Sequence, residues 1–271
     1  MIEVHERMLK HFHLFANHPA MFEQNLSRKS LSQEDLMERE RLAALGEFTA
    51  MIVHEARNPL TTIELGLKHA KKVLNSEADL QRIALALSES QRLNQLLNEL
   101  LDYAKPKPLN LAITNVDAFL KTMLAQIQDL PEAADRSIHY ANEAPTIEVM
   151  ADVNKLKQVF LNLFRNALEA IAIQESVRCL VKQNASDHCV CISIRNAGKP
   201  IPSELLPHLG TPFFSTKSDG TGLGLAISKQ IVIAHGGSLK ILSSAKETIV
   251  SISLPIANQR NVLYEHCVCP D

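Results

Sequence analysis

The sequence contains no tryptophan, and aromatic residues make up only 4% of its 271 residues. A core with few aromatic side chains and no tryptophan rests on Leu, Ile, Val, Ala and Met, which favours helices. No run reaches the 18 or more apolar residues of a membrane span, so we expect no transmembrane helix. The formal net charge of -2 gives no overall attraction to nucleic acid or to an anionic membrane, and we expect neither as a partner.

The cysteines lack a framework of regular spacings, and their number, five, is odd. Both features predict reduced thiols in the cytosol. The chain also begins without the apolar core of a signal peptide, so we expect a cytoplasmic protein. Cys189 and Cys191 alternate along a predicted strand and should be core residues. Cys267 and Cys269 lie in the tail 257–271, where disorder, metal binding and redox chemistry are alternatives.

Apolar residues recur every three or four positions between about 38 and 74, and again between 80 and 104. This periodicity predicts two long amphipathic helices. The segment 75–79 breaks the first, and Lys-Pro-Lys-Pro at 105–108 ends the second, because the residue before a proline is pushed out of the helical region. Two such helices form an antiparallel hairpin. Its broad apolar surface predicts dimerisation into a four-helix bundle.

Beyond this linker the elements become shorter and alternate unevenly. Strands are predicted over 146–152, 178–184 and 188–196, with a final hairpin over 238–244 and 248–255. Asp152 is placed to cap a helix from about 154 to 172. Glycines 236 and 237 close a second helix. The pattern predicts an α/β sandwich of mixed or antiparallel pairing.

Three glycines, at 220, 222 and 224, lead into the second of these helices. Glycines let the backbone approach a ligand closely, and a helix N-terminus presents free N–H groups. Glycines that lead into a helix therefore suit the binding of a phosphate group. The stretch matches neither the P-loop nor the dinucleotide fingerprint, and alone it is equally a glycine-rich loop. Upstream, Asn162 and Asn166 lie one turn apart and offer amide oxygens of a kind that Mg²⁺ accepts. Either asparagine alone could be an ordinary surface residue.

The first helix carries an unusual polar cluster within the sequence MIVHEARNPLTTIELGL, residues 51–67. His54 is followed directly by Glu55, and Asn58 shares the face of His54 because it lies four positions on. Pro59 cannot donate a hydrogen bond to the carbonyl of Glu55, and we expect a bend there.

Five ordered motifs connect these features: HEARNPL, NLFRNALEA, NAGKPIP, TPFFSTK and GTGLGL. Their order resembles the H, N, G1, F and G2 boxes of sensor histidine kinases over residues 38–256. The second half is similar to the ATPase superfamily shared with DNA gyrase and mismatch-repair proteins. The implied fold class is α+β, with a helical-hairpin dimerisation domain over 38–106 and an α/β sandwich ATP-binding domain over 110–256. Residues 1–37 would form a partly helical segment for signal input or partner contact.

The resemblance implies that His54 accepts the γ-phosphoryl group of ATP on a ring nitrogen. The neutral form of an imidazole, which makes up about half or more of it at cytosolic pH, is nucleophilic. Glu55 would accept a hydrogen bond from the other ring nitrogen and aid proton removal. Asn58 would contact the γ-phosphate or position a water.

The resemblance also implies an ATP site with a bound Mg²⁺. The residues that it assigns to ATP binding are Asn162, Asn166, Asn196, Gly198, Phe214, Lys217, Gly220, Thr221, Gly222, Leu223 and Gly224. Asn166 is the implied Mg²⁺ ligand, and Lys217 would contact the phosphates as a flexible cation. Phe213 and Phe214 match the hinge of a lid over ATP.

One motif departs from the family pattern. Asn196 stands where the family has an aspartate that accepts from the adenine amino group, and Pro200 replaces the second glycine. An amide oxygen accepts a weaker hydrogen bond than a carboxylate, so we expect ATP binding to persist but to weaken. The implied activity is autophosphorylation followed by transfer to a response-regulator aspartate. The implied partners are a second copy of the chain, bound through residues 38–106, and a response regulator. The signal could also arrive through an upstream sensor protein.

Two other functions are alternatives. A regulatory scaffold that mainly dephosphorylates a response regulator would account for the altered G1 motif. An ATPase of the gyrase or mismatch-repair kind would leave the motif around His54 unexplained.

Overall fold

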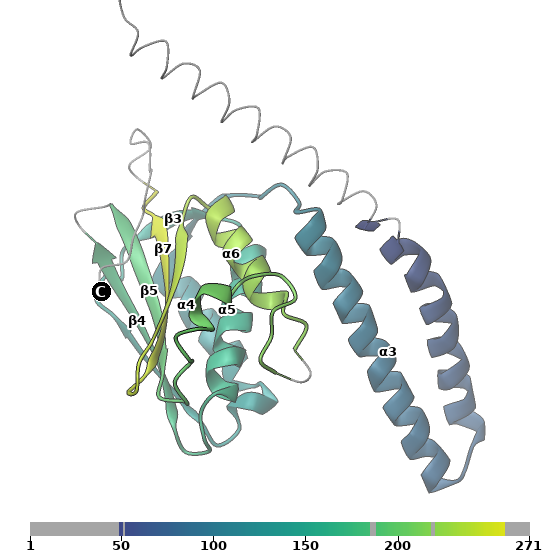
Figure 1. Cartoon of the computed structure of the whole chain (residues 1–271). Coiled ribbons are helices and arrows are strands. Elements are labelled where there is room, and N and C mark those ends of the chain that lie inside the picture. Colours follow the sequence, from purple (N-terminus) through teal and green to yellow (C-terminus); the bar gives the residue numbers. More distant parts are fainter. Residues whose placement is uncertain (1–48, 51, 185–187, 218–219, 258–271) are drawn as a thin grey trace, which may run out of the picture.

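The computed structural model describes residues 49–50, 52–184, 188–217 and 220–257 (Figure 1). The expectations for residues 1–37 and for Cys267 and Cys269 lie outside these ranges. The first described helix covers positions 49–50 and 52–73 and is called the His54 helix below. The elements that follow are α3 (Glu77–Ala104), β1 (Ala112–Asn115), α4 (Val116–Gln128), η1 (Pro131–Ala133), β2 (Ser137–Asn142), β3 (Glu148–Ala151), α5 (Val153–Glu169), β4 (Ser176–Asn184), β5 (Cys189–Asn196), η2 (Leu206–His208), α6 (Gly224–Ala234), β6 (Ser238–Ser243) and β7 (Thr248–Pro255).

The His54 helix and α3 form the expected helical hairpin (Figure 1). The guanidinium of Arg57 donates to the side chain of Asn98 at 2.8 Å, which joins the two helices. Lower in the hairpin, the Glu64 carboxylate accepts from Ser90 at 2.9 Å and from Asn94 at 2.7 Å. The hairpin leaves many large apolar side chains exposed, namely Ile52, Ile63, Leu65, Val73, Leu74, Leu85 and Leu93. No helix in the described part of the chain is both long and apolar enough to span a membrane.

The second half contains a five-stranded sheet in the order β2-β4-β5-β7-β6. β2 pairs with β4 in parallel, whereas the other three pairings are antiparallel, so the prediction of a mixed sheet is confirmed. β1 and β3 form a small antiparallel sheet of their own. Helices α4, α5 and α6 pack on one face of the large sheet (Figure 1).

The core lies between this sheet and the helices, and its aromatic content is small. Phe119 of α4 meets Phe160 of α5 edge-on, with ring centroids 5.6 Å apart. Aliphatic side chains of β4 and β5, such as Val181 and Ile192, fill most of the remainder. The core therefore matches a composition that is rich in aliphatic residues and poor in aromatic ones.

The predicted cap of α5 is present. Asp152 accepts hydrogen bonds from the backbone N–H groups of Asn154 and Lys155 at 3.0 and 3.1 Å. A further backbone donor, the N–H of Asn110, reaches the other carboxylate oxygen at 3.0 Å. These donors lower the pKa of Asp152, that of Asn110 most strongly, since each stabilises the charged carboxylate. The cap fixes the start of the helix that carries both asparagines of the N motif.

The cysteines differ from the expectation of reduced thiols. Cys189 and Cys191 of β5 are both disulfide-bonded, so the prediction is wrong for these two. Among the described residues, Cys179 is the free cysteine, and burial raises the pKa of its thiol to about 12. Cys189 and Cys191 are buried as expected, but they lie on the face of the sheet opposite the helices.

Helix α3 joins the two halves of the chain. Leu100 and Tyr103, near its C-terminal end, pack against the core of the second half. Asp102 forms an ion pair with Lys155 of α5 at 3.4 Å and accepts from Gln158 at 3.3 Å. In Figure 1, α3 therefore lies between α6 and the His54 helix.

Candidate active site

The polar cluster of the first helix faces solvent. His54, Glu55 and Asn58 are all exposed on the His54 helix, which continues through Pro59 to position 73. In the described part of the chain, no side-chain hydrogen bond joins His54 to Glu55. An exposed imidazole of this kind is accessible to a second domain or to another protein. The structure does not bring it together with the asparagines of α5, which lie beyond α3.

The two asparagines of the N motif share one face of α5, as predicted. The amide nitrogen of Asn166 donates to the amide oxygen of Asn162 at 3.4 Å. Asn162 in turn donates to the hydroxyl of Ser228 at 2.9 Å, and that hydroxyl donates to the carbonyl of Gly224 at 2.9 Å. This chain of hydrogen bonds fixes Asn162 against the start of α6, which orients the amide of Asn166.

Lys217 of the F motif reaches the N motif from a loop about 50 positions along the chain. Its ammonium donates to the amide oxygen of Asn166 at 2.7 Å and forms an ion pair with the carboxylate of Glu169. These two side chains lie three positions apart on α5 and present hard oxygen atoms to one cation. The same oxygen donors suit Mg²⁺ together with phosphate and water. Within the described residues there is no cluster of three or more His, Cys, Asp or Glu side chains that could hold a metal.

The glycine turn before α6 packs against both other motifs. Gly222 has φ of +70°, and a Cβ there would lie 2.6 Å from the backbone nitrogen of Phe214. A Cβ on Gly224 would lie 2.6 Å from the amide oxygen of Asn162. Gly222 therefore requires glycine for conformation and space, whereas a side chain at Gly224 would have to displace the amide of Asn162. Leu223, between them, is buried and precedes the first residue of α6.

Thr221 within this turn has two hydrogen bonds. Its hydroxyl accepts from the backbone N–H of Leu223 at 3.1 Å, which shapes the turn. The same hydroxyl donates to the carboxylate of Glu99 on α3 at 2.7 Å. The turn that would hold phosphate is thus attached to the helical hairpin.

The G1 and F motifs border the same region. Asn196 is the buried last residue of β5, and Gly198 follows so close to Ala170, just after α5, that a Cβ would collide with its carbonyl group. The G1 turn therefore lies beside the end of the helix that carries Asn166. Phe214 is half-buried, with its ring centroid 5.6 Å from that of His208, whereas Phe213 is exposed and has φ of +66°.

Three residues of this arrangement were not predicted. Glu169 could have been found, because it lies three positions after Asn166 on the same helix face. Ser228 could have been found in the same way, because it lies four positions after Gly224 on the same helix face. No signal could have pointed to Glu99, because its partner lies 122 positions away and neither residue belongs to a periodic pattern.

Comparison with known proteins agrees with this geometry. The family described as Histidine kinase-, DNA gyrase B-, and HSP90-like ATPase matches residues 151–258, and the His Kinase A (phospho-acceptor) domain matches residues 44–109. The sensor histidine kinase ZraS of Klebsiella oxytoca is 34% identical over 238 residues, which cover 86% of this chain and 51% of ZraS. The chain thus spans about half the length of ZraS.

Solved structures support the same assignment. Histidine kinase ThkA in complex with response regulator protein TrrA matches with a TM-score of 0.61 and 29% identity, over 83% of this chain and 65% of that one. Full-length ShkA in complex with AMPPNP matches with a TM-score of 0.69 over 79% of this chain and 47% of ShkA; at 21% identity this likeness shows the fold alone. The fold and site define a phospho-acceptor hairpin followed by a gyrase-like ATPase domain. The chain belongs to the sensor histidine kinases of two-component systems.

Proposed function

We propose that this chain binds ATP, transfers the γ-phosphoryl group to His54 and passes it on to an aspartate of a response regulator. The observation that carries the proposal is the convergence of Asn166, Lys217 and the glycine turn in the same chain as an exposed histidine in a phospho-acceptor motif. We assign phosphotransfer and dimerisation to residues 38–106 and ATP binding to residues 110–256.

Autophosphorylation would proceed by attack of a ring nitrogen of His54 on the γ-phosphorus. The new nitrogen–phosphorus bond forms as the bond between the γ-phosphorus and the bridging oxygen breaks, and ADP leaves. Glu55, next to His54 and exposed, would take the proton from the other ring nitrogen, and Asn58 would contact the transferred group. A regulator aspartate would then attack the phosphorus, and the bond to His54 would break.

The ATP site would work by position and charge rather than by covalent chemistry. Lys217 would exchange the Glu169 carboxylate for a phosphate oxygen, and backbone N–H groups of the glycine turn would hold the neighbouring phosphates. Asn196 would accept from the adenine amino group beside Gly198. Mg²⁺, which would neutralise phosphate charge, fits the oxygen donors of Asn166 and Glu169 that already hold a cationic side chain.

We further propose a homodimer through the hairpin. Exposed apolar side chains along both helices, including Ile63, Leu85 and Leu93, would be buried between two copies. A regulator would bind at the exposed face around His54, and the complex of the related kinase ThkA with TrrA supports a partner of this kind. No observation favours the alternative of a scaffold that acts mainly as a phosphatase.

Incubation with γ-labelled ATP and Mg²⁺ tests this proposal. The wild-type chain should take up label that is lost in acid and retained in alkali, as expected for a phosphohistidine. His54→Ala should abolish the label, whereas His69→Ala, which alters an exposed histidine farther along the same helix, should leave it unchanged. Equal labelling of the His54→Ala variant would refute the assignment.

A further inference from the structure

A carboxylate of the hairpin lies on the turn where the proposed function requires phosphate. Thr221, between Gly220 and Gly222, donates a 2.7 Å hydrogen bond to Glu99 of α3. Both side chains are half-buried. The backbone N–H groups of this same turn are the ones assigned above to the phosphates of ATP. A phosphate bound there would lie close to the negative charge of Glu99.

The Lys217 side of the site also contains a carboxylate. The ammonium of Lys217 forms an ion pair with Glu169 and donates to Asn166 at 2.7 Å. The two carboxylates differ in the element that carries them. Glu169 belongs to α5 of the ATPase domain, so its exchange for a phosphate moves side chains within one domain. Glu99 belongs to the hairpin, so its displacement breaks a contact between two domains.

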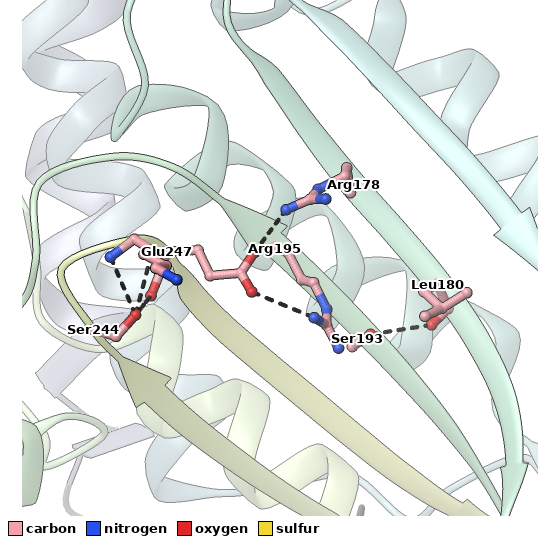
Figure 2. A network of polar contacts seen from close by, with 7 residues as sticks. Arg178, Leu180, Ser193, Arg195, Ser244 and Glu247 are labelled. Carbon is pink, nitrogen blue, oxygen red and sulfur yellow. Dashed lines mark hydrogen bonds and ion pairs between the residues drawn. The ribbon is translucent and has the colours of Figure 1, made fainter. Parts of the chain in front are cut away.

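The charge of Glu99 is not neutralised by a cation of the described chain. Figure 2 shows the opposite case at the large sheet, where the carboxylate of Glu247 lies between Arg178 at 2.8 Å and Arg195 at 3.4 Å. Within the described residues, Glu99 instead accepts from two neutral donors, the hydroxyl of Thr221 and the amide of Gln95 at 2.9 Å. A half-buried negative charge without a cation repels a nearby phosphate, because solvent screens it only in part.

A second polar contact holds the same two domains together at a distance from the glycine turn. Asp102 of α3 pairs with Lys155 of α5 at 3.4 Å. Lys155 lies seven positions before Asn162, which is about two turns of helix away from the residue that contacts the glycine turn. Asp102 therefore contributes to docking of the ATPase domain on α3 without touching the proposed phosphate site.

We propose that ATP binding competes with docking of the ATPase domain on α3, because phosphate on the glycine turn displaces Glu99 and releases the domain from the hairpin. The inference rests on the proposed ATP site. Docking then lowers the apparent affinity for ATP, since only undocked chains bind it well. By linkage, ATP weakens docking by the same factor. Release also removes α3 from between the ATPase domain and the His54 helix of the same chain (Figure 1).

Calorimetric titration of the full chain with Mg-AMPPNP, a non-hydrolysable ATP analogue, tests the competition. Glu99→Gln keeps an acceptor for Thr221 but removes the charge, so the Kd should fall roughly 5-fold. Asp102→Asn weakens docking away from the glycine turn, and the Kd should fall about 2-fold to 5-fold. Glu89→Gln removes an exposed carboxylate from the same helix and should leave the Kd unchanged.

The pattern across these variants separates docking from local repulsion. A lower Kd in Glu99→Gln alone would overturn the proposal, because repulsion between charges would then act without release of the domain. Unchanged Kd values in both Glu99→Gln and Asp102→Asn would overturn it while leaving the ATP site intact. Absence of binding in the wild type and in every variant would refute the ATP site itself, and the competition with it.

Amide hydrogen exchange of the full chain measures the release of the domain. Residues 96–104, at the docked end of α3, should exchange faster in saturating Mg-AMPPNP than without nucleotide. Residues 77–85, at the other end of the helix, should not change. In Glu99→Gln, residues 96–104 should exchange faster even without nucleotide. Unchanged or slower exchange of residues 96–104 in the nucleotide-saturated wild type would contradict the proposed release.

Discussion

The hydroxyl of Thr221 donates a 2.7 Å hydrogen bond to the carboxylate of Glu99, although 122 positions separate the two residues. Thr221 belongs to the glycine turn of the proposed nucleotide site, and Glu99 belongs to the second helix of the phospho-acceptor hairpin. The ion pair between Asp102 and Lys155 lies near this bond on the same helix. Together these contacts hold the ATPase domain against α3, with the His54 helix on the far side (Figure 1).

Loss of this contact should release the ATPase domain. Because the docked arrangement places α3 between the glycine turn and the His54 helix of the same chain, Glu99→Ala should increase the initial rate of autophosphorylation. A hydrogen bond to a charged group contributes about 1.5–3 kcal/mol, so we expect roughly a 10-fold change or more. Gln91→Ala, an exposed change on the same helix, is the control. A decrease with Glu99→Ala would mean that the docked arrangement is the active one.

Lys217 should be needed for nucleotide binding. Lys217→Met removes the ammonium group that bridges Asn166 and Glu169. The same ammonium group would contact a phosphate of bound ATP. We expect the Kd for Mg-ATP to rise at least about 10-fold in a calorimetric titration, the size of a lost charge-assisted hydrogen bond. Lys229→Met changes an exposed lysine on α6 and should bind as the wild type does. Equal affinities for the two variants would remove Lys217 from the site.

The backbone at Gly222 permits no side chain. Gly222→Ala forces a Cβ into the backbone of the F motif at φ of +70°, so it should abolish ATP binding while the hairpin stays folded. Gly66→Ala is the matched control, because nothing lies within 4 Å of its added Cβ. Gly66 lies in a helix interior, where alanine is more favourable than glycine, so Gly66→Ala should stabilise the protein by up to about 1 kcal/mol. Normal ATP binding by Gly222→Ala would show that the turn does not hold the nucleotide.

Asp117 should make the ATPase domain sensitive to acid. Hydrogen bonds from Lys121, Asn142 and Tyr140 lower the pKa of Asp117 to about 2. The folded pKa lies below the unfolded value of 3.8, so the stabilisation is complete above about pH 4 and is lost as the pH falls toward 2. The shift corresponds to at most about 2 kcal/mol at neutral pH, because solvent screens part of the interaction.

A comparison of variants across pH measures this contribution. Asp117→Asn should lower the free energy of unfolding at pH 7, with a difference from wild type that shrinks below pH 4. Asp129→Asn, at the exposed end of α4, should show no such pH-dependent difference. A deficit in Asp117→Asn that stays constant from pH 7 to pH 2 would exclude the carboxylate charge as its cause.

Elements with a strong local signal were predictable from the sequence. The hairpin, α5 and the strands of the final hairpin followed from periodicity, the cap at Asp152 and the flanking glycines. The segment 110–145 gave no assignment, although it contains α4 and β2. The parallel strand β2 pairs with β4 about 40 positions away, and such a pairing leaves no local pattern.

The residues of the candidate site were likewise predictable only where a local sequence pattern marks them. Asn162, Asn166 and the glycines were recognisable because spacing on one helix face, or a short motif, defines them. The contacts of Thr221 with Glu99 and of Lys217 with Glu169 depend on how loops fold back onto helices, which the sequence pattern does not encode. The cysteine expectation failed for a related reason. Spacing along the chain does not show which cysteines form disulfides.

Localisation of the phosphoryl group is the most direct test of the central claim. The wild-type chain is incubated with Mg-ATP, digested at alkaline pH to preserve phosphohistidine, and analysed by tandem mass spectrometry. The account predicts one phosphorylated peptide with the group on His54, and its loss in Lys217→Met. Phosphate on another residue, or a protein that binds ATP but carries no phosphate under these conditions, would contradict it.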